Sequence, residues 1–137
     1  MKKIVFAFLL ILSANSYAQK SLDTKIAVTV TDTVGLYEKV RMGFVNTDFI
    51  VKDTRRIDTL VTYPRDSKPL GYVTAFAAIN GNTVTFWGFS ANRKMNLLGY
   101  TVSPTEYDKV YYYKRGTGWN LLLNVAKSLN GLLSYSK

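Results

Sequence analysis

Three groups of basic residues are the side chains best suited to bind a ligand in this sequence. One group surrounds a predicted hairpin tip, and two pairs stand at other predicted strand ends: Lys52, Arg55 and Arg56; Arg93 and Lys94; Lys114 and Arg115. Arginine binds phosphate and carboxylate groups through a bidentate fork. We interpret the groups as a basic rim for a polyanion. The alternative is that these charges only prevent sheet edges from pairing with each other.

An aromatic stretch adjoins the last basic pair. It contains Tyr107, Tyr111, Tyr112, Tyr113 and Trp119. Aromatic faces beside Lys and Arg suit sugars and other stacked ligands, and in a strand Tyr111 and Tyr113 share one face. Tyr111 and Tyr113 therefore join the candidate ligand-binding residues, with core packing as the alternative role.

The absence of cysteine and histidine excludes several classes of enzyme. Thiolate nucleophiles, Ser-His-Asp triads and imidazole or thiolate metal sites all need one of these residues. The nearest remaining pairs are Glu106 with Asp108 and Ser103 with Lys109. Lys109 lies in a polar, charged segment where an amine keeps its proton. We predict a protein that is not an enzyme, with no catalytic residues and no cofactor.

Four aspartates precede threonine, at positions 23, 32, 53 and 58. Calcium loops gather several oxygen ligands within about a dozen residues and usually carry glycine at the bend. None of these stretches does. Asp and Thr also hydrogen-bond their own backbone in turns, so turn formation is the better interpretation and no metal site is predicted.

The first 18 residues have the architecture of a signal peptide. Lys2 and Lys3 precede an apolar run from Ile4 to Leu12, and small residues lead up to Ala18. The run is shorter than the ~20 residues of a membrane-spanning helix. We expect cleavage after Ala18 and export to the periplasm, the outer surface or the medium. No cysteine is present to carry a lipid, so a lipoprotein is not expected.

The remaining chain is basic. Removing 18 of 137 residues, with Lys2 and Lys3, leaves 119 residues with 16 basic and 9 acidic side chains, a formal charge of +7. That length predicts one domain, residues 19–137. The anionic partners outside the cytoplasm are acidic polysaccharide, lipopolysaccharide and membrane surfaces, and nucleic acid is not expected. Charge for solubility alone is the alternative.

A central hairpin organises the predicted fold. Residues 72–79 and 83–89 favour strands, and Asn80-Gly81-Asn82 suits a tight turn. Both faces of the first strand are apolar, which predicts cover on both sides. We also predict strands over residues 25–31 and 36–44, a hairpin over 49–63 and a loop over 64–69.

The C-terminal third contains the predicted helix. Apolar residues at helical spacing indicate an amphipathic helix over about 119–130, closed by Asn130-Gly131 and followed by a tail or a last strand. Before it we expect a strand over 95–102, one helical turn over 104–107 and a strand over 109–114. A longer helix through residue 113 is the alternative for that last segment.

These elements predict a mainly β fold: a single-domain antiparallel β-sandwich or small β-barrel with one C-terminal α-helix packed on it. The predicted function is an exported, non-catalytic binding or structural module of the cell envelope. The first alternative is a small barrel that carries an apolar ligand. The second is a secreted, membrane-active protein that acts through its C-terminal amphipathic helix.

Overall fold

The computed structural model describes residues 19–20, 22–67, 71–92, 94–99, 101–102, 106–112 and 116–137. The predicted signal peptide, residues 1–18, lies outside them. The ordered elements are β1 (Lys25–Thr29), α2 (Leu36–Asn46), β2 (Thr59–Val61), β3 (Arg65–Ser67), β4 (Gly71–Asn80), β5 (Thr83–Ala91), β6 (Lys94–Met95), β7 (Thr101–Val102), β8 (Asp108–Lys109), α3 (Thr117–Lys127) and β9 (Leu132–Ser136).

The predicted central hairpin is confirmed as β4 and β5. The two strands pair antiparallel from Tyr72 with Ala91 to Asn80 with Thr83. Only Gly81 and Asn82 remain between the last pair, and Gly81 has a φ of 59°. A two-residue hairpin turn requires such positive φ values, which glycine adopts without steric cost.

Every other strand of the main sheet is arranged around this hairpin. Its order is β2-β4-β5-β1-β9, with β3 also paired to β4 and β8 also paired to β5. All these pairs are antiparallel, and the seven-stranded sheet is not closed. The mainly β, antiparallel fold with a C-terminal helix is therefore confirmed. The finer choice between sandwich and barrel stays a prediction.

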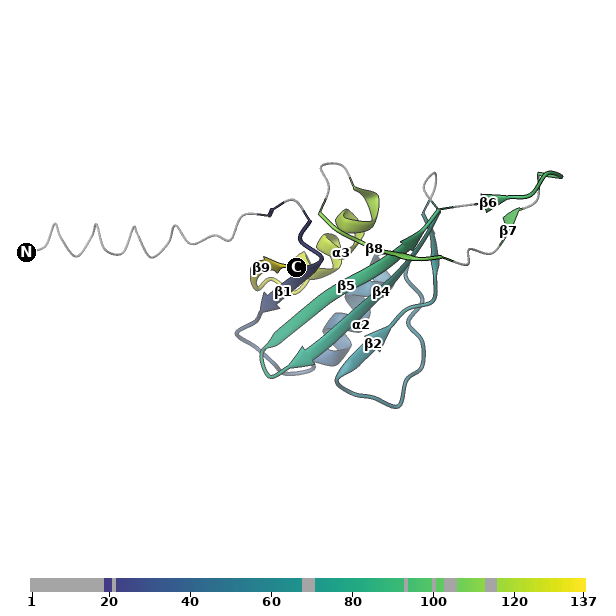
Figure 1. The fold of residues 1–137 in the computed structure, drawn as a ribbon. Coiled ribbons are helices and arrows are strands. Elements are labelled where there is room, and N and C mark those ends of the chain that lie inside the picture. Colours follow the sequence, from purple (N-terminus) through teal and green to yellow (C-terminus); the bar gives the residue numbers. More distant parts are fainter. Residues whose placement is uncertain are drawn as a thin grey trace, which may run out of the picture.

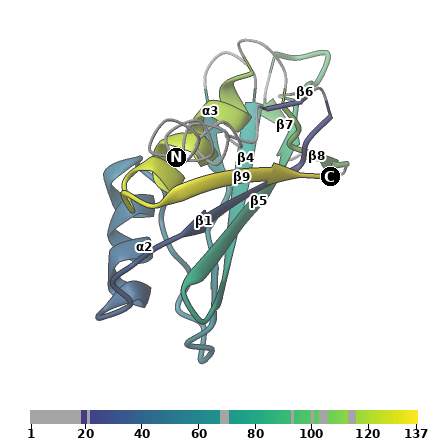
Figure 2. The same cartoon turned by 90° about the vertical axis from the view of Figure 1, so that its left-hand side faces the viewer.

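Helices α2 and α3 both lie on one face of the sheet (Figures 1 and 2). The apolar stripe of α3, the residues at helical spacing on one side of the helix, is buried there as predicted, through Trp119, Leu122 and Ala126. On the sheet side of this core, four side chains of β1 and β5 are fully buried: Ile26, Val28, Val84 and Phe86. After α3, Asn130 adopts a left-handed φ of 52° that turns the chain into β9. The single hydrophobic core thus lies between the helices and the sheet.

Residues 36–44 form a helix, so the strand predicted there is wrong. Leu36, Val40 and Phe44 are buried, whereas Met42 is 47% exposed. The apolar residues alternate in the sequence, but those that reach the core are four positions apart. That spacing is one face of an α-helix. Gly35, with a φ of 62°, precedes the first turn.

The segments before β4 are partly as predicted. The hairpin over 49–63 is confirmed: Val51 bridges to Thr62, and Lys52 donates its backbone N–H to the Val61 carbonyl at 2.8 Å. The loop predicted over 64–69 is wrong at Arg65–Ser67, which pairs with β4 as β3. Prolines flank these three residues without occupying them, so their backbone groups stay free to pair.

The single strand predicted over 95–102 is instead a small hairpin of β6 and β7. Asn96 accepts the Leu98 backbone N–H at 3.0 Å, and Gly99 has a φ of 79°. Turn chemistry interrupts the apolar run there. Of residues 109–112, the described part of the predicted strand 109–114, only Lys109 belongs to a strand, β8, and Val110 is buried in the core. Of the helical turn predicted over 104–107, residues 104–105 lie outside the described residues, and residues 106–107 are not helical.

The approach to α2 provides a pH-dependent interaction. Lys39 donates a hydrogen bond to the Asp32 carboxylate at 2.6 Å, and the Val34 backbone N–H donates another at 3.0 Å. The hydrogen bond from Lys39 is the largest cause that lowers the pKa of Asp32 below its ordinary 3.8. Because this pKa is lower in the folded chain than in the unfolded chain, the ionised carboxylate stabilises the fold at pH values above the unfolded-state pKa. This stabilisation is lost as the pH falls through the folded-state pKa.

We therefore expect an NMR titration of the Asp32 carboxyl to give a midpoint below 3.8, and Lys39→Ala to move that midpoint upward. The effect on stability should be small, because both side chains are solvent-exposed. A midpoint at or above 3.8 in the parent protein would contradict this assignment.

Candidate aromatic binding face

Three clustered aromatic side chains lie on the face of the sheet that is turned away from the helices. Phe76 on β4 and Trp87 and Phe89 on β5 are half-buried. Among the described residues, no helix lies over this face (Figure 2). The prediction that the first hairpin strand is covered on both sides is therefore wrong. The residues between, such as Ala75 and Ala77, are the ones that face the helices and are fully buried.

The three rings form one continuous cluster, here called the aromatic face. Phe76 and Trp87 are cross-strand partners whose rings stack at 5.6 Å with an interplanar angle of 9°. Phe89 meets Phe76 edge-on at 5.7 Å and 85°. Aromatic pairs in these geometries are mutually stabilising, so the cluster is a rigid apolar surface.

Two lysines flank the aromatic face. β1 and β8 pair with the same edge of β5, where Phe86 opposes Ile26 and Phe89 opposes Lys109. Between these two pairings the surface is hollowed into a groove of about 410 Å³, lined by Trp87, Phe89, Lys25 and Lys109 among others. None of the described residues that line it is acidic. The groove therefore combines aromatic surface with positive charge.

Comparison with known proteins assigns no function to this chain. No protein family, curated protein or solved structure matches the chain. Within the described ranges, no group of three or more acidic side chains is placed to hold a metal ion. No helix in the same ranges has the length and apolar character needed to cross a bilayer.

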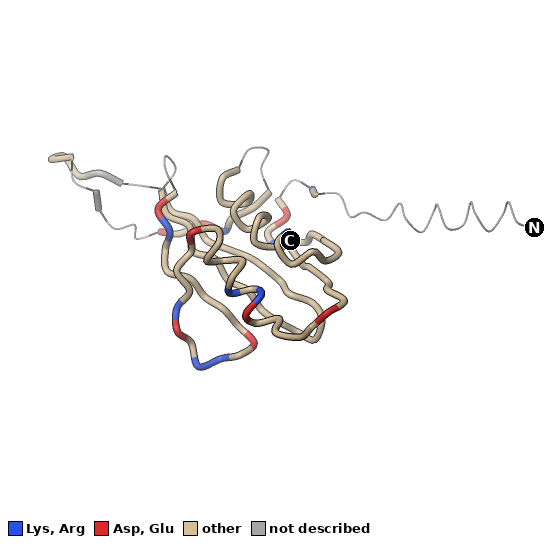
Figure 3. Tube along the Cα trace, turned by 180° about the vertical axis from the view of Figure 1, so that it is seen from behind, with Lys and Arg blue, Asp and Glu red and all other residues tan. Residues whose placement is uncertain are grey.

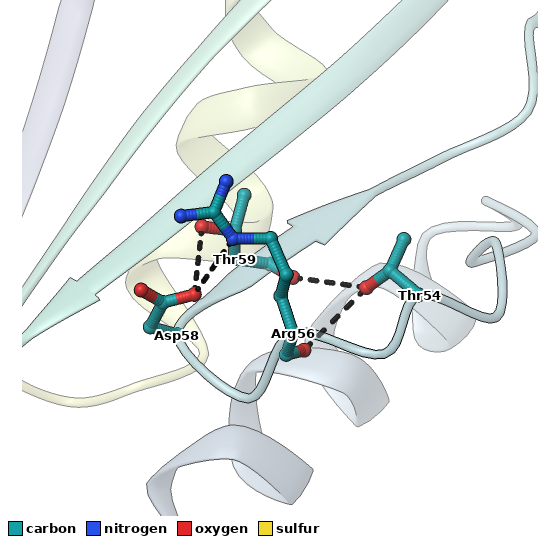
Figure 4. A network of polar contacts seen from close by, with 4 residues as sticks. All are labelled: Thr54, Arg56, Asp58 and Thr59. Atoms are coloured by element: carbon teal, nitrogen blue, oxygen red, sulfur yellow. Dashed lines mark hydrogen bonds and ion pairs between the residues drawn. The ribbon is translucent and has the colours of Figure 1, made fainter.

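The predicted basic rim is only partly within the described residues. Arg55 and Arg56 lie exposed in the loop between Val51 and β2. In Figure 3 basic and acidic residues alternate along that loop, so its charge is mixed. Arg56 approaches Asp58 at 3.4 Å, and the Thr54 hydroxyl donates to the carbonyls of Arg56 and Thr59 (Figure 4). These contacts order the loop without defining a ligand site.

Lys94 is the one rim residue outside this loop that the structure describes, and it is not brought to the loop. The loop lies near the turn end of the central hairpin, since Thr59 pairs with Ala78, whereas Lys94 follows the far end of β5. The nine residues of β5 separate the two ends by ~30 Å at ~3.3 Å per residue. Arg93, Tyr113, Lys114 and Arg115 lie outside the described residues.

The predicted aromatic stretch divides between surface and core. Tyr111 is 47% exposed, whereas Tyr112 packs edge-on against Trp119 at 5.7 Å. Among the weighed catalytic candidates, Glu106, Asp108 and Lys109 are exposed, and Ser103 lies outside the described residues.

Proposed function

We propose that this chain is an exported, non-catalytic binding module of the cell envelope that holds an acidic polysaccharide on its aromatic face. The observation that carries the proposal is the placement of Phe76, Trp87 and Phe89 on an uncovered sheet face with Lys25 and Lys109 beside them. The predicted signal peptide and the +7 charge support the location and the sign of the partner.

The chemistry of a sugar chain fits this surface. A sugar ring presents C–H groups on its flat faces and polar groups at its rim, so it buries apolar area against an aromatic ring while its rim stays hydrated. Trp87 stacks on Phe76 with one ring face and lines the groove, so its other face would supply the flat surface. The carboxylates of a uronic acid polymer would meet the ammonium groups of Lys25 and Lys109 in charge-assisted hydrogen bonds.

A lipid surface is the second candidate partner. At the tip of the β6–β7 hairpin, Leu97 is fully exposed and Leu98 is 80% exposed. Figure 1 draws this hairpin away from the body of the domain. Exposed leucines next to basic residues are the composition of interfacial membrane contacts. The stripe of α3 is buried against the sheet, so lipid contact through this hairpin would not require that helix to leave the core.

The test is retention of the purified protein on immobilised polygalacturonate. We expect salt-sensitive retention, because exposed charges are screened over ~10 Å at 0.1 M ionic strength. Trp87→Thr should weaken binding roughly tenfold, the loss of one central aromatic anchor. Threonine keeps the preference for strand at this position, and a thermal melt of the variant checks its fold.

Two matched variants separate the candidate surfaces. The double variant Arg55→Ala, Arg56→Ala should keep its retention, because neither arginine lines the groove beside the aromatic face. Leu97→Ser with Leu98→Ser should also keep polysaccharide retention and should lose binding to anionic vesicles only if the lipid candidate holds. A folded Trp87→Thr protein that is retained like the parent would refute the aromatic face as the binding surface.

A further inference from the structure

One edge of the main sheet is open. The strand order ends in β9, and among the described residues β9 pairs on one side only, with β1 (Figure 2). Apart from that pairing, the one backbone hydrogen bond to β9 within the described ranges comes from Thr24, which adjoins β1. Alternate residues of an edge strand direct their N–H and C=O groups away from the neighbouring strand. The outer side of β9 therefore presents backbone donors and acceptors to a further strand.

The opposite edge of the sheet is covered by the chain itself. Beyond β2, Lys52 donates its backbone N–H to the Val61 carbonyl at 2.8 Å. Tyr63 donates its own N–H to the Ile50 carbonyl, also at 2.8 Å. The loop that continues over residues 53–58 carries both basic and acidic side chains. Cover and charge are two ways by which proteins keep sheet edges from pairing. The fold thus protects the β2 edge and leaves the β9 edge unprotected.

The sequence of β9 lacks the features that block edge pairing. It reads Leu-Leu-Ser-Tyr-Ser, five residues without a charge or a proline. Five residues is a common length for a paired strand. The chain as a whole is basic, so a charged edge strand would repel a second copy. No such repulsion arises within β9.

The side chains of β9 bring apolar surface to this edge. Leu133 opposes Val28, and Val28 is fully buried in the core. Tyr135 opposes Ile26, which is also fully buried. Cross-strand partners share a face of the sheet, so Leu133 and Tyr135 lie on the helix side, where both are partly buried. Leu132 points to the other face and is 79% exposed.

We infer that β9 pairs antiparallel with β9 of a second copy of this chain and joins two seven-stranded sheets into one. A two-fold axis at Ser134 is the register that pairs all five residues of the strand. In this register Leu133 of one copy opposes Tyr135 of the other, and such aliphatic–aromatic pairs are stabilising. No two charged residues of β9 meet. The strand is therefore complementary to itself, which is the reason for assigning a second copy as the partner.

This pairing would place two aromatic faces on the same side of one sheet, because opposing residues of an antiparallel pair share a face. The two β5 strands would be separated by β1 and β9 of each copy, which is five strand spacings, or ~24 Å at ~4.8 Å each. A polysaccharide that spans both grooves would gain roughly 10²- to 10⁴-fold in apparent affinity. This gain rests on the proposed function, whereas the pairing of β9 does not.

Analytical ultracentrifugation of the purified protein over a range of concentrations tests the pairing. An interface built on one short edge strand is small, so we expect a reversible dimer with a Kd of roughly 10–100 µM. Isotope-filtered NOE spectra of mixed labelled and unlabelled protein should show contacts between Leu133 of one copy and Tyr135 of the other. A protein that stays monomeric at about 1 mM, or a dimer without these contacts, would overturn the inference.

Charge variants at Ser134 test the register. Ser134→Lys and Ser134→Asp each place two like charges opposite one another at the two-fold axis, which disfavours pairing. We expect each variant alone to be a folded monomer, because Ser134 is only partly buried and charged side chains are usual on edge strands. An equimolar mixture of the two should recover the dimer. Thr59→Lys, on β2 at the opposite edge, is the matched control and should dimerise like the parent.

Two results with these variants would contradict the inference: a Ser134→Lys protein as dimeric as the parent, or a mixture that stays monomeric. Thermal melts check that the variants fold, and the NOE experiment on the parent decides the question without them.

Retention on polygalacturonate separates this inference from the proposed function. Ser134→Lys should elute at lower salt than the parent, although it carries an added positive charge, because it has lost the second groove. Digalacturonate is too short to reach both grooves and should bind the variant no more weakly than the parent. A dimeric parent that is not retained would refute the aromatic face as the binding surface and leave the pairing of β9 standing. A retained but monomeric parent would do the reverse.

Discussion

Replacing Leu122 by aspartate is expected to unfold the protein. Leu122 is fully buried in the middle of α3, where it faces Gly88 of β5: a Cβ added at Gly88 would lie 3.4 Å from the Leu122 Cδ1. Burying a leucine contributes ~1.5–3 kcal/mol, and an unpaired buried carboxylate adds several more to the cost. The sum is a large share of the ~5–15 kcal/mol that typically stabilises a domain.

Circular dichroism melts of Leu122→Asp and Asn124→Asp measure this effect. Asn124 lies exposed on the same helix, so the control adds the same charge without burying it. We expect the control to melt within a few degrees of the parent and Leu122→Asp to show no folded baseline. A Leu122→Asp melt that coincides with the parent would mean that the apolar stripe of α3 lies outside the core, as the membrane-active alternative requires.

Gly131→Ala is expected to have the second largest effect. An added Cβ would lie 2.5 Å from the Thr29 carbonyl oxygen and 2.6 Å from the Val28 Cγ1. A backbone carbonyl cannot rotate away as a long side chain can, so β9 would have to shift relative to β1. Overpacking of this kind costs ~1–3 kcal/mol, and we expect the upper end of that range. The melting temperature should fall by roughly 10 °C.

The neighbouring residue provides the control with the opposite sign. Asn130 adopts a φ of 52°, a conformation that glycine adopts without the cost of a Cβ. Asn130→Gly should therefore melt at or above the parent temperature. If Gly131→Ala melted as high as Asn130→Gly, close packing of the turn against β1 would be refuted.

The sequence was most informative where one local signal agreed with the tertiary packing. Asn80-Gly81 has turn chemistry that only a tight hairpin satisfies, and β4 and β5 formed as predicted. The apolar residues from Trp119 to Ala126 have helical spacing, and the residues at that spacing are the ones buried in the core. In both cases propensity, pattern and burial agree, which is the condition under which sequence determines local structure.

The α2 segment shows the opposite case. Leu36, Val40 and Phe44 fit a period of two because they belong to an alternating series, and they fit a helix because they are four residues apart. The exposure of Met42 separates the two patterns, and exposure is a property of the folded chain. A pattern consistent with both periods is resolved only by the surface that the element packs against.

The aromatic face depends on contacts that sequence order does not reveal. The sequence predicts that Phe76, Trp87 and Phe89 are strand residues, but apolar residues on both faces of β4 do not indicate which face stays uncovered. Lys25 and Lys109 come from β1 and β8, and only the pairing of both strands with β5 brings them to one groove. The predicted basic rim relied instead on charges at strand ends, and strand ends occur at both ends of a sheet.

The pairing of β1 with β9 has a consequence for how the sheet assembles. Among the described strands β1 comes first and β9 last in the sequence, and Lys25 lies opposite Ser136. One edge of β1 therefore stays unpaired until residues 132–136 reach it. Pairings of such long sequence separation form slowly. The unpaired edge can meet other unfolded chains during that interval, so folding should benefit from a holding chaperone until β9 has paired.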